Sequence, residues 1–556
     1  MATISEALAI ALQHHQAGRL DAAEQIYQRI LQVEPDQPDA LHFMGVLTAQ
    51  LGRHQAAVDY ITRAIAVRPN AAPYHLNLGL AYQASQKLDE AIASYRRALQ
   101  LQPEFVEAHC NLGNALIEQG KLAEAVACYH RAIELRPDFA EARSNLGKAH
   151  LEQRKLDEAA ACCRRALQLK PGLAEAHCNL GNALLEQGKL EEAVACYLRA
   201  LELKPDFPEA HCNLGDAFFL LSRLDEAAAC CRRALDFNPD YADAHMGLAV
   251  LELLRGDLGH GWPEYEWRWR TKQMPPRSFL QPRWDGGSLT GKTILLHAEQ
   301  GLGDTIQFVR YAPLVKRLGS MVILECQKPL LPLLATCPGI DRLVAQGDVL
   351  PDFDAHAPLL SLPTILRTSL DTIPAAVPYL FAAPALVEHW REKLRTVSGY
   401  KIGISWHGQP GYGSRLARKI PLQQFASLAE IPGVRLISLQ KGAPRKELAQ
   451  ARERFPLLEL GDEVDQAACA FLDTAAIMMN LDLVVTSDTA VGHLGGSLGA
   501  VVWIALPRPP DWRWLLDRSD SPWYPTMRLF RQKISGDWTG VFQEIQDALR
   551  KRLAIT

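Results

Sequence analysis

The sequence lacks the long apolar run that a membrane-spanning helix requires. A transmembrane helix needs about 20 consecutive, mostly apolar residues, and no uninterrupted apolar run of about that length occurs in the sequence. The N-terminal residues MATISEALAIALQHH also lack a basic stretch followed by an apolar core and a small-residue cleavage site, so no secretory signal is expected. We therefore expect a cytoplasmic protein without a membrane span.

The sequence also lacks a strong excess of charge of either sign. Its 59 Lys and Arg residues nearly balance 63 Asp and Glu residues, which leaves a net charge of −4. Nucleic acids and anionic membranes attract strongly basic surfaces, so neither is expected as the main partner. With 556 residues, 48% of them hydrophobic, the chain is too long for one core, and its length suggests about three to four domains.

No Cys-x-x-Cys pair occurs among the 12 cysteines. Nine of them lie between Cys110 and Cys231, and four recur at intervals of 34 residues: Cys128, Cys162, Cys196 and Cys230. Reduced cysteine behaves as a small buried apolar residue. The regular spacing therefore favours recurring packing positions, and no metal site is expected.

A 34-residue repeat fills the first half of the chain. Prolines recur at this interval at positions 35, 69, 103, 137, 171, 205 and 239. The pattern is clearest in NLGNALIEQGKLAEAVACYHRAIELRPDF, where a Leu-Gly pair stands in one helix, Ala and Tyr in the next, and Pro at the end. This is the tetratricopeptide pattern. Seven regular units over about residues 4–241 and a degenerate eighth unit, ending GWPEYEWRWR, predict an α-solenoid whose core comes from stacking.

Two ladders of polar residues run through the repeats. The first is an asparagine ladder: Asn77, Asn111, Asn145, Asn179 and Asn213. An asparagine side chain offers a donor and an acceptor, enough to hold a peptide backbone without reading its sequence. The array resembles the repeats of the O-GlcNAc transferases, in which a similar ladder holds acceptor polypeptide; the alternative is that these asparagines tie adjacent helices together. The second ladder, of one histidine per unit, favours packing or surface roles.

Residues 274–290 are rich in Pro and Gly and form the expected linker after the repeat superhelix of residues 1–273. The linker leads into GGSLTGKT, which matches the phosphate-loop pattern G-x-x-x-x-G-K-[ST]. A phosphate loop follows a strand and opens a helix. Here the motif precedes the strand TILLHAE, so ATP binding at this position is not expected.

The second half alternates short β-rich runs with helical segments. TILLHAE, MVILECQ and DRLVAQ predict strands of one parallel sheet, and KIGISWHG, RLISLQ, LDLVVTSD and AVVWIALP predict strands of another. Two such lobes in tandem place a cleft between them, outside the carboxyl ends of the strands. The expected boundaries are a first lobe at 291–385, an inter-lobe segment at 386–399, a second lobe at 400–535 and a C-terminal helix at 536–556.

Several motifs of this half carry a family resemblance. GLGD at 301–304, SDTAVGHLGGSLG at 487–499 and SWHGQPGYGSRLARKIPLQQF at 405–425 resemble the signature turns and donor-lobe loop of the heptosyltransferase-like glycosyltransferases. The segment DWRWLLDRSDSPWYPTMRLFRQ is similar to the ending of bacterial tetratricopeptide proteins that carry this domain. The resemblance implies the GT-B fold, with two Rossmann-like lobes of which the second binds a nucleotide-sugar donor. It also implies inversion at the anomeric carbon.

The resemblance points to Asp304, after the Gly301–Gly303 turn, as the base that deprotonates the acceptor hydroxyl. An aspartate at a helix start is also a good N-cap, and both interpretations stay open. Positive groups and helix-start amides would stabilise the leaving phosphate. The expected donor-binding residues are Ser405, His407, Arg418, Lys419, Lys441, Thr489, Ala490, Val491 and His493.

Some of these assignments have alternatives. Arg418 and Lys419 either neutralise the diphosphate or form a solvated basic patch, and His493 either donates to a phosphate or packs the helix start. No D-x-D motif stands at a convincing strand end, so transfer without a metal or other cofactor is expected, with the nucleotide sugar as co-substrate. The expected function is sugar transfer to an acceptor, possibly a polypeptide, recruited by the repeats. The alternative is a non-catalytic interaction scaffold whose second half senses a nucleotide sugar or binds nothing.

Overall fold

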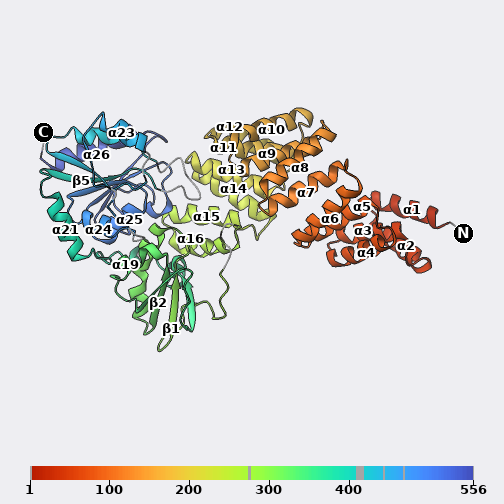
Figure 1. Cartoon of the computed structure of the whole chain (residues 1–556), viewed down its shortest axis with the longest axis horizontal. Helices are drawn as coiled ribbons and strands as arrows, with labels where there is room; N and C mark the ends of the chain where they lie inside the picture. The colour runs from red at the N-terminus through yellow and green to blue at the C-terminus, as the bar shows by residue number, and fades with distance from the viewer. Residues whose placement is uncertain are drawn as a thin grey trace. The chain divides into compact units, whose positions relative to one another are not determined.

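The computed structural model describes residues 3–272, 274, 277–408, 419–442, 445–461, 463–466 and 470–554. The chain divides into two compact units, which we call the repeat unit (residues 1–217) and the sheet unit (residues 218–556) (Figure 1). No helix in the described parts of the chain is long and apolar enough to cross a membrane.

The repeat unit is a solenoid of short helices in consecutive pairs. The first helix of a pair has 13 residues and the second 14. The helices are α1 (Ile4–Gln16), α2 (Leu20–Val33), α3 (Pro38–Gln50), α4 (His54–Val67), α5 (Ala72–Ala84), α6 (Leu88–Leu101), α7 (Val106–Glu118), α8 (Leu122–Leu135), α9 (Ala140–Glu152), α10 (Leu156–Leu169), α11 (Ala174–Glu186), α12 (Leu190–Leu203) and α13 (Pro208–Leu220).

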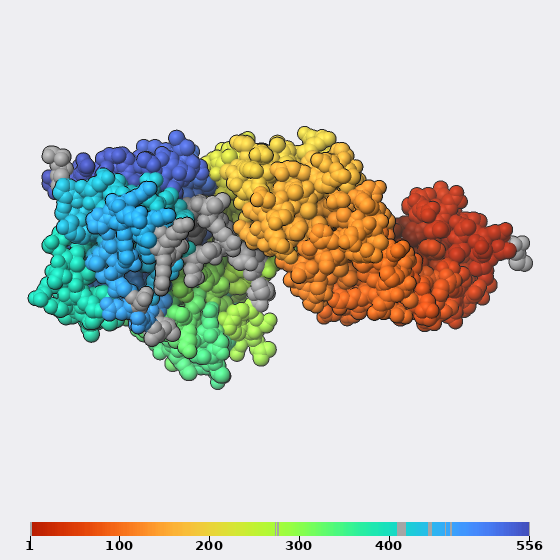
Figure 2. All heavy atoms as spheres, turned by 45° about the horizontal axis from the view of Figure 1, so that its top comes forward, coloured from red at the N-terminus to blue at the C-terminus, as the bar shows by residue number. Residues whose placement is uncertain are grey.

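In each pair from α3 and α4 to α11 and α12, the two helices approach closely at a glycine. A Cβ added to Gly113 would lie 2.7 Å from the ring of Tyr129, and one added to Gly181 would lie 2.5 Å from the ring of Tyr197. Both tyrosines are fully buried, because the missing side chain leaves room for the aromatic ring of the second helix. Side chains fill the space between neighbouring helices that the ribbon leaves open (Figure 2).

The helical array continues into the sheet unit as α14 (Leu224–Phe237), α15 (Ala242–Arg255), α16 (Leu258–Tyr265) and the 3₁₀ helix η1 (Glu266–Arg270). These last helices pack in the same core as the sheets. Trp262 of α16, only 1% exposed, lies edge-on to Phe308 and to Trp512. This tryptophan of the degenerate final repeat therefore packs against the α/β part of the sheet unit.

The first sheet is parallel and has the strand order β3-β2-β1-β4. Its strands are β1 (Thr293–His297), β2 (Met321–Cys326), β3 (Arg342–Ala345) and β4 (Ala355–Pro358). Its other elements are α17 (Leu302–Phe308), η2 (Val309–Tyr311), α18 (Ala312–Lys316), η3 (Lys328–Leu330), α19 (Leu331–Leu334), η4 (Leu359–Ser361), α20 (Leu362–Ile365) and η5 (Leu370–Thr372). The helical segment after β1 is broken into α17, η2 and α18, and Pro313 stands at the start of its last piece.

The second sheet is also parallel and has the order β10-β9-β8-β5-β6-β7, which is the strand order of a six-stranded doubly wound fold. Its strands are β5 (Tyr400–Ser405), β6 (Val434–Ser438), β7 (Leu457–Glu459), β8 (Leu483–Ser487), β9 (Val502–Leu506) and β10 (Met527–Arg531). Its other elements are α21 (Pro384–Leu394), η6 (Leu422–Phe425), α22 (Ala426–Ala429), α23 (Arg445–Arg452), α24 (Leu472–Met478), α25 (Ala490–Ser497), η7 (Trp512–Trp514) and α26 (Trp538–Arg552).

Both faces of the second sheet are covered. One face shares a continuous apolar core with α15, α16 and the first sheet, through residues such as Val484, Ile504 and Leu494. The other face packs against α22 and α26, with Ile404 and Phe542 in a separate core. The strand order reverses between β5 and β8, so the carboxyl ends of these two strands form the crevice in which ligands of such folds bind.

Candidate functional site

The starts of two helices from different sheets meet in the sheet unit. Helix α17 follows β1 of the first sheet, and α25 follows β8 of the second. A Cβ added to Gly303, near the start of α17, would lie 3.2 Å from Cδ2 of His493 and 3.3 Å from Cα of Ala490. The structure thus brings into contact the Gly301–Asp304 and Thr489–His493 turns that the sequence singled out.

Both carboxylate oxygens of Asp304 have a hydrogen-bond partner. The backbone N–H of Gly301 donates to Oδ2 at 3.0 Å, and Nη2 of Arg513 donates to Oδ1 at 2.5 Å. Helix α17 begins at Leu302, so Asp304 caps it backwards from the third helical position and is not itself the N-cap residue. Its side chain is 21% exposed, which leaves it reachable at the edge of a packed region.

Arg513 is the residue of this site that sequence reasoning missed. Besides Asp304, it donates through Nε to Gln307 at 2.8 Å and through Nη1 to Asp511 at 2.9 Å. Burial by itself lowers the pKa of Arg513, but the negative charges of Asp511 and Asp304 outweigh burial and raise that pKa above its usual value. The guanidinium is therefore a fixed positive charge beside the candidate base.

His493 lies inside an aromatic cluster. Only 5% of it is exposed, its Nδ1 is 3.0 Å from the hydroxyl of Tyr524, and its ring stacks on Trp514 with the centroids 5.4 Å apart. The packing role considered for His493 is thus present at one ring nitrogen and one ring face. A phosphate contact of this residue stays a prediction.

At the turn from β8 into α25, no side-chain hydrogen bond caps the start of the helix. Thr489 is the N-cap residue, and its hydroxyl lies 3.2 Å from that of Thr486 and makes no capping bond. The first N–H groups of a helix, here those of Ala490 and Val491, have no partner within the helix. Ser487 is fully buried, and its hydroxyl has no hydrogen-bond partner among the described residues. Polar groups with unused capacity therefore gather at this turn.

The carboxyl end of β5 lies beside this turn. A Cβ added to Gly408 would be 3.4 Å from Cγ2 of Thr489. Ser405 is 1% exposed, and its hydroxyl donates to Oε1 of Gln440 at 3.1 Å. The same oxygen also accepts the backbone N–H of His407 at 3.1 Å. Ser405 therefore supports the strand end, and Gln440, which the sequence gave no reason to single out, fixes its shape.

The predicted cations of the donor loop are placed only in part. Arg418 lies outside the described residues. Lys419 is 3.5 Å from a carboxylate oxygen of Glu447, and the ammonium of Lys441 donates to the backbone carbonyl of Asp465 at 2.8 Å. Both described lysines therefore already have acceptors on their own lobe.

In the repeat unit the asparagine ladder links neighbouring repeats. Asn145 donates to Oδ1 of Asn114 at 3.0 Å, and Asn213 donates to Oδ1 of Asn182 at 3.0 Å. Asn179 is 8% exposed and donates to the hydroxyl of Ser144 at 3.1 Å. These bonds join residues one repeat apart, which is the helix-tying role; peptide binding by the ladder stays a prediction.

The histidine ladder has a structural role. The Nε2–H of His109 donates to the carbonyl of Pro103 at 2.9 Å, and the same bond recurs at His75, His177, His211 and His245. Arg143, which interrupts the ladder, also donates to the proline carbonyl of its own repeat. The cysteines of the repeats are free thiols, and burial raises the pKa of Cys163 to about 12.

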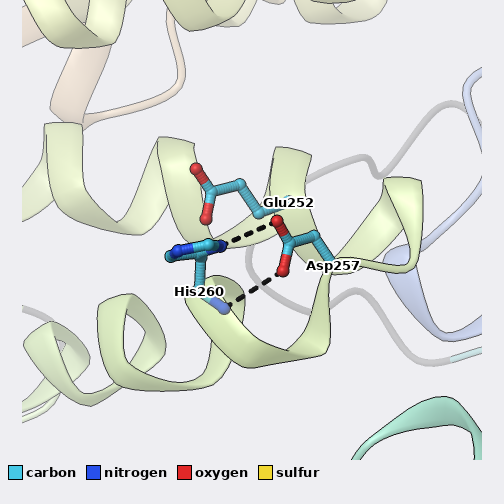
Figure 3. Close-up of side chains that lie close together, drawn as sticks. All are labelled: Glu252, Asp257 and His260. Atoms are coloured by element: carbon cyan, nitrogen blue, oxygen red, sulfur yellow. Dashed lines mark hydrogen bonds and ion pairs between the residues drawn. The ribbon is translucent and has the colours of Figure 1, made fainter.

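One group with metal-ligand chemistry lies in the described part of the sheet unit: Glu252 of α15 with Asp257 and His260 around the start of α16 (Figure 3). Nδ1 of His260 is 2.8 Å from Asp257, whose other carboxylate oxygen accepts the N–H of His260 as a helix cap. These local contacts raise the pKa of His260. Asp257 and His260 are exposed, and capping of α16 accounts for their arrangement.

Models of the tetratricopeptide family match the chain. Models described as "TPR repeat" match residues 84–120, 113–154 and 181–222, and models described as "Tetratricopeptide repeat" match residues 14–79, 140–173, 162–195 and 208–241. The repeats are tetratricopeptide repeats. The period, the solenoid and the buried glycine contacts agree with this assignment.

Individual relatives resemble only part of the chain. Protein FlbA of Caulobacter vibrioides is 30% identical over 328 residues, 54% of each chain. The Cut9 and Hcn1 assembly of the APC/C contains a chain that is 19% identical over 48% of this chain and 53% of its own length, with a TM-score of 0.40. A tetratricopeptide protein of Thermus thermophilus is 25% identical over 33% of this chain and its own full length, with a TM-score of 0.31. The chain spans about half the length of the first two relatives.

Proposed function

We propose that the sheet unit is a glycosyltransferase of the GT-B type that uses a nucleotide-diphosphate sugar. The observation that carries the proposal is the meeting of α17 and α25, whose starts come from different sheets and place Asp304 beside the Thr489–His493 turn. A crevice at the carboxyl ends of parallel strands is the usual ligand site of such sheets. The family resemblance of the two turns adds the donor and the reaction class.

The reaction follows from the chemistry of these groups. The carboxylate of Asp304 takes the proton of an acceptor hydroxyl, and the acceptor oxygen forms a bond to the anomeric carbon of the sugar. The bond from that carbon to the phosphate oxygen breaks, and its electron pair leaves with the nucleoside diphosphate. Amide groups of Ala490 and Val491 and the positive end of α25 stabilise the charge that develops on the phosphate. Attack opposite the leaving group inverts the anomeric carbon.

The repeats form a tetratricopeptide scaffold, which is the part of the chain suited to protein partners. We propose that they recruit the acceptor and that this acceptor is a polypeptide. The side-chain N–H groups of Asn145, Asn179 and Asn213 donate to residues of the preceding repeat. A peptide would therefore bind to the side-chain oxygens and remaining N–H groups of the ladder, or to other residues.

The donor is tested by thermal unfolding of the whole protein with UDP-, GDP-, ADP-, CMP- and dTDP-linked sugars. A ligand at a concentration far above its Kd adds about 3 kcal/mol to the stability of the unit that binds it. We expect one nucleotide family to stabilise the sheet unit. If none of the five does so, the sheet unit does not bind a nucleotide sugar and the proposal fails.

The base is tested with Asp304→Asn. This change keeps the size of the side chain and removes the negative charge, so donor binding should persist while release of nucleoside diphosphate falls by about 100-fold or more. Asp371→Asn, in the exposed 3₁₀ helix η5, is the matched control and should keep full turnover. Equal turnover of Asp304→Asn and the wild type would end the assignment of Asp304 as the base.

The role of the ladder is tested with Asn→Ala changes at 111, 145 and 179. If the ladder holds the acceptor, these changes raise the acceptor KM and leave donor hydrolysis unchanged. If it only ties helices together, the changes at Asn145 and Asn179 lower the stability of the repeat unit by about 1 kcal/mol each, and the KM of the folded protein is unchanged.

A non-catalytic scaffold is the second candidate. The observation that favours it is that Asp304 is already paired with Arg513 and Gly301, as it would be in a site kept only for structure. Under this alternative, the wild type binds protein partners through the repeats and shows no donor turnover even when a nucleotide sugar stabilises it.

A further inference from the structure

The pair formed by Arg513 and Asp304 spans the two lobes of the sheet unit. Asp304 follows β1 of the first sheet, whereas Arg513 belongs to η7, which follows β9 of the second sheet. The two residues are 209 positions apart in the chain. The side chain of Arg513 is 8% exposed and that of Asp304 is 21% exposed. A contact this distant in sequence and this well buried forms only when both lobes are in place.

Arg513 is held rigidly from several sides. Gln307, on the same helix as Asp304, accepts from its Nε, and Asp511 accepts from its Nη1. Its guanidinium carbon lies 4.2 Å from the ring centroid of Trp512, which itself packs edge-on against Trp262. A planar guanidinium fixed by three acceptors and a ring has one orientation, and it imposes that orientation on the carboxylate it contacts.

The contacts of Asp304 leave it able to act on a hydroxyl. An ionised carboxylate has about four lone-pair positions, and Arg513 and the N–H of Gly301 occupy one on each oxygen. The remaining lone-pair positions can accept the proton of a hydroxyl. The contribution of Arg513 is to fix the orientation in which the carboxylate presents them.

We propose that Arg513 is a positioning residue for Asp304. It fixes the orientation of the Asp304 carboxylate, and it can do so only when the two lobes are in contact. The inference rests on the proposed glycosyl transfer and adds a residue that the sequence motifs do not contain. A carboxylate without this partner would rotate away from the acceptor hydroxyl, and a displacement of about 1 Å in such a group costs about 100-fold in rate.

The chain offers a matched control in Arg531. Its guanidinium donates to the carbonyls of Trp514, Leu515 and Arg518, so it supports the same segment as Arg513. Its contacts in this segment are with backbone carbonyls, whereas Arg513 donates to the carboxylate of Asp304. Loss of Arg531 therefore loosens the segment while the cation beside Asp304 stays in place.

The experiment compares wild type, Arg513→Ala, Arg513→Lys and Arg531→Ala as full-length chains. The probe is whichever of the UDP-, GDP-, ADP-, CMP- or dTDP-sugars stabilises the wild type, with water as acceptor and nucleoside diphosphate release as the readout. We expect Arg513→Ala to lose about 100-fold in kcat with an unchanged donor Kd. Added guanidinium, far below denaturing concentrations, should restore part of that loss. Arg531→Ala should keep its kcat per folded molecule and should not respond to guanidinium.

The outcomes separate the two claims. Wild-type kcat in Arg513→Ala, or an equal loss in Arg531→Ala without guanidinium rescue, would show that Arg513 is only a structural contact. If Arg513→Ala does not fold, Arg513→Lys decides: it keeps a cation without the planar fork, so an intermediate kcat is expected and full wild-type kcat contradicts the inference. Absence of donor binding or turnover in the wild type refutes the proposed function itself before any variant is compared.

Discussion

The close approach of helices within each repeat predicts the effect of Gly181→Ala. The new Cβ would lie 2.5 Å from Cε1, 2.8 Å from Cδ1 and 2.9 Å from Cζ of Tyr197. The ring cannot tilt away freely because it is fully buried and its hydroxyl donates to Asn182 at 2.7 Å. Overpacking of this kind costs about 1–3 kcal/mol, whereas replacing a helical glycine by alanine gains about 1 kcal/mol. Because three atoms of a fixed ring would lie under 3.0 Å from the new Cβ, the upper part of that cost, about 2–3 kcal/mol, applies. We therefore expect a net loss of about 1–2 kcal/mol.

The assay is amide hydrogen exchange of α11 and α12, because a repeat array need not unfold in one step. A loss of about 1–2 kcal/mol makes exchange of these helices about 5- to 30-fold faster. Gly172→Ala is the control: nothing lies within 4 Å of its added Cβ, so its exchange rates should match the wild type. If Gly181→Ala exchanges no faster than the wild type, the close-approach argument is wrong.

The remaining predictions concern the sheet unit. Arg268→Met should lower its stability by about 3–5 kcal/mol in thermal unfolding, because it leaves a buried Glu299 uncompensated. The side chains of Arg268 and Glu299 are 1% and 3% exposed, and the exposed Arg270→Met is the control that should change little. Burial and the charge of Arg277 lower the pKa of His297 to about 3, so only the unfolded chain takes up a proton as the pH falls below about 6.5. Urea unfolding should therefore show about 2 kcal/mol less stability at about pH 5 from this group, a loss that is absent in His297→Gln. Equal pH dependence of stability in the wild type and in His297→Gln would contradict this role of His297.

Much of the repeat unit follows from the sequence because each repeat is a local structure. Gly113 and Tyr129 lie in one helix pair, so their spacing alone predicts their contact. The histidine ladder also acts within single repeats. The asparagine ladder acts between repeats, and its partners Asn114 and Asn182 occur in alternate units only, which a single repeat motif does not reveal.

The sheets could be predicted less completely. The β-rich runs of the sequence predict β1, β2, β3, β5, β6, β8 and β9. Strands β4 and β7 have four and three residues, and β4 carries His and Pro, so neither gives a β signal in the sequence. Strand β10 lies in a tryptophan-rich segment that was noticed only for its resemblance to other proteins.

The candidate site shows the same limit. The two turns of the site were found because their glycines and polar residues form compact motifs. Arg513 and Gln440 were missed because each acts through a partner on a distant segment of the chain. The contact of Arg513 with Asp304 depends on how the two lobes meet, and the contacts of Gln440 depend on how β5 and β6 pair; neither leaves a local pattern.

The central claim is that the meeting of α17 and α25 binds a nucleotide sugar. The most direct measurement is hydrogen exchange of the full chain with and without each nucleotide-linked sugar, followed at residues 301–304 and 487–493. One nucleotide family should slow exchange in both segments together. Unchanged exchange in both segments with every donor would contradict the claim.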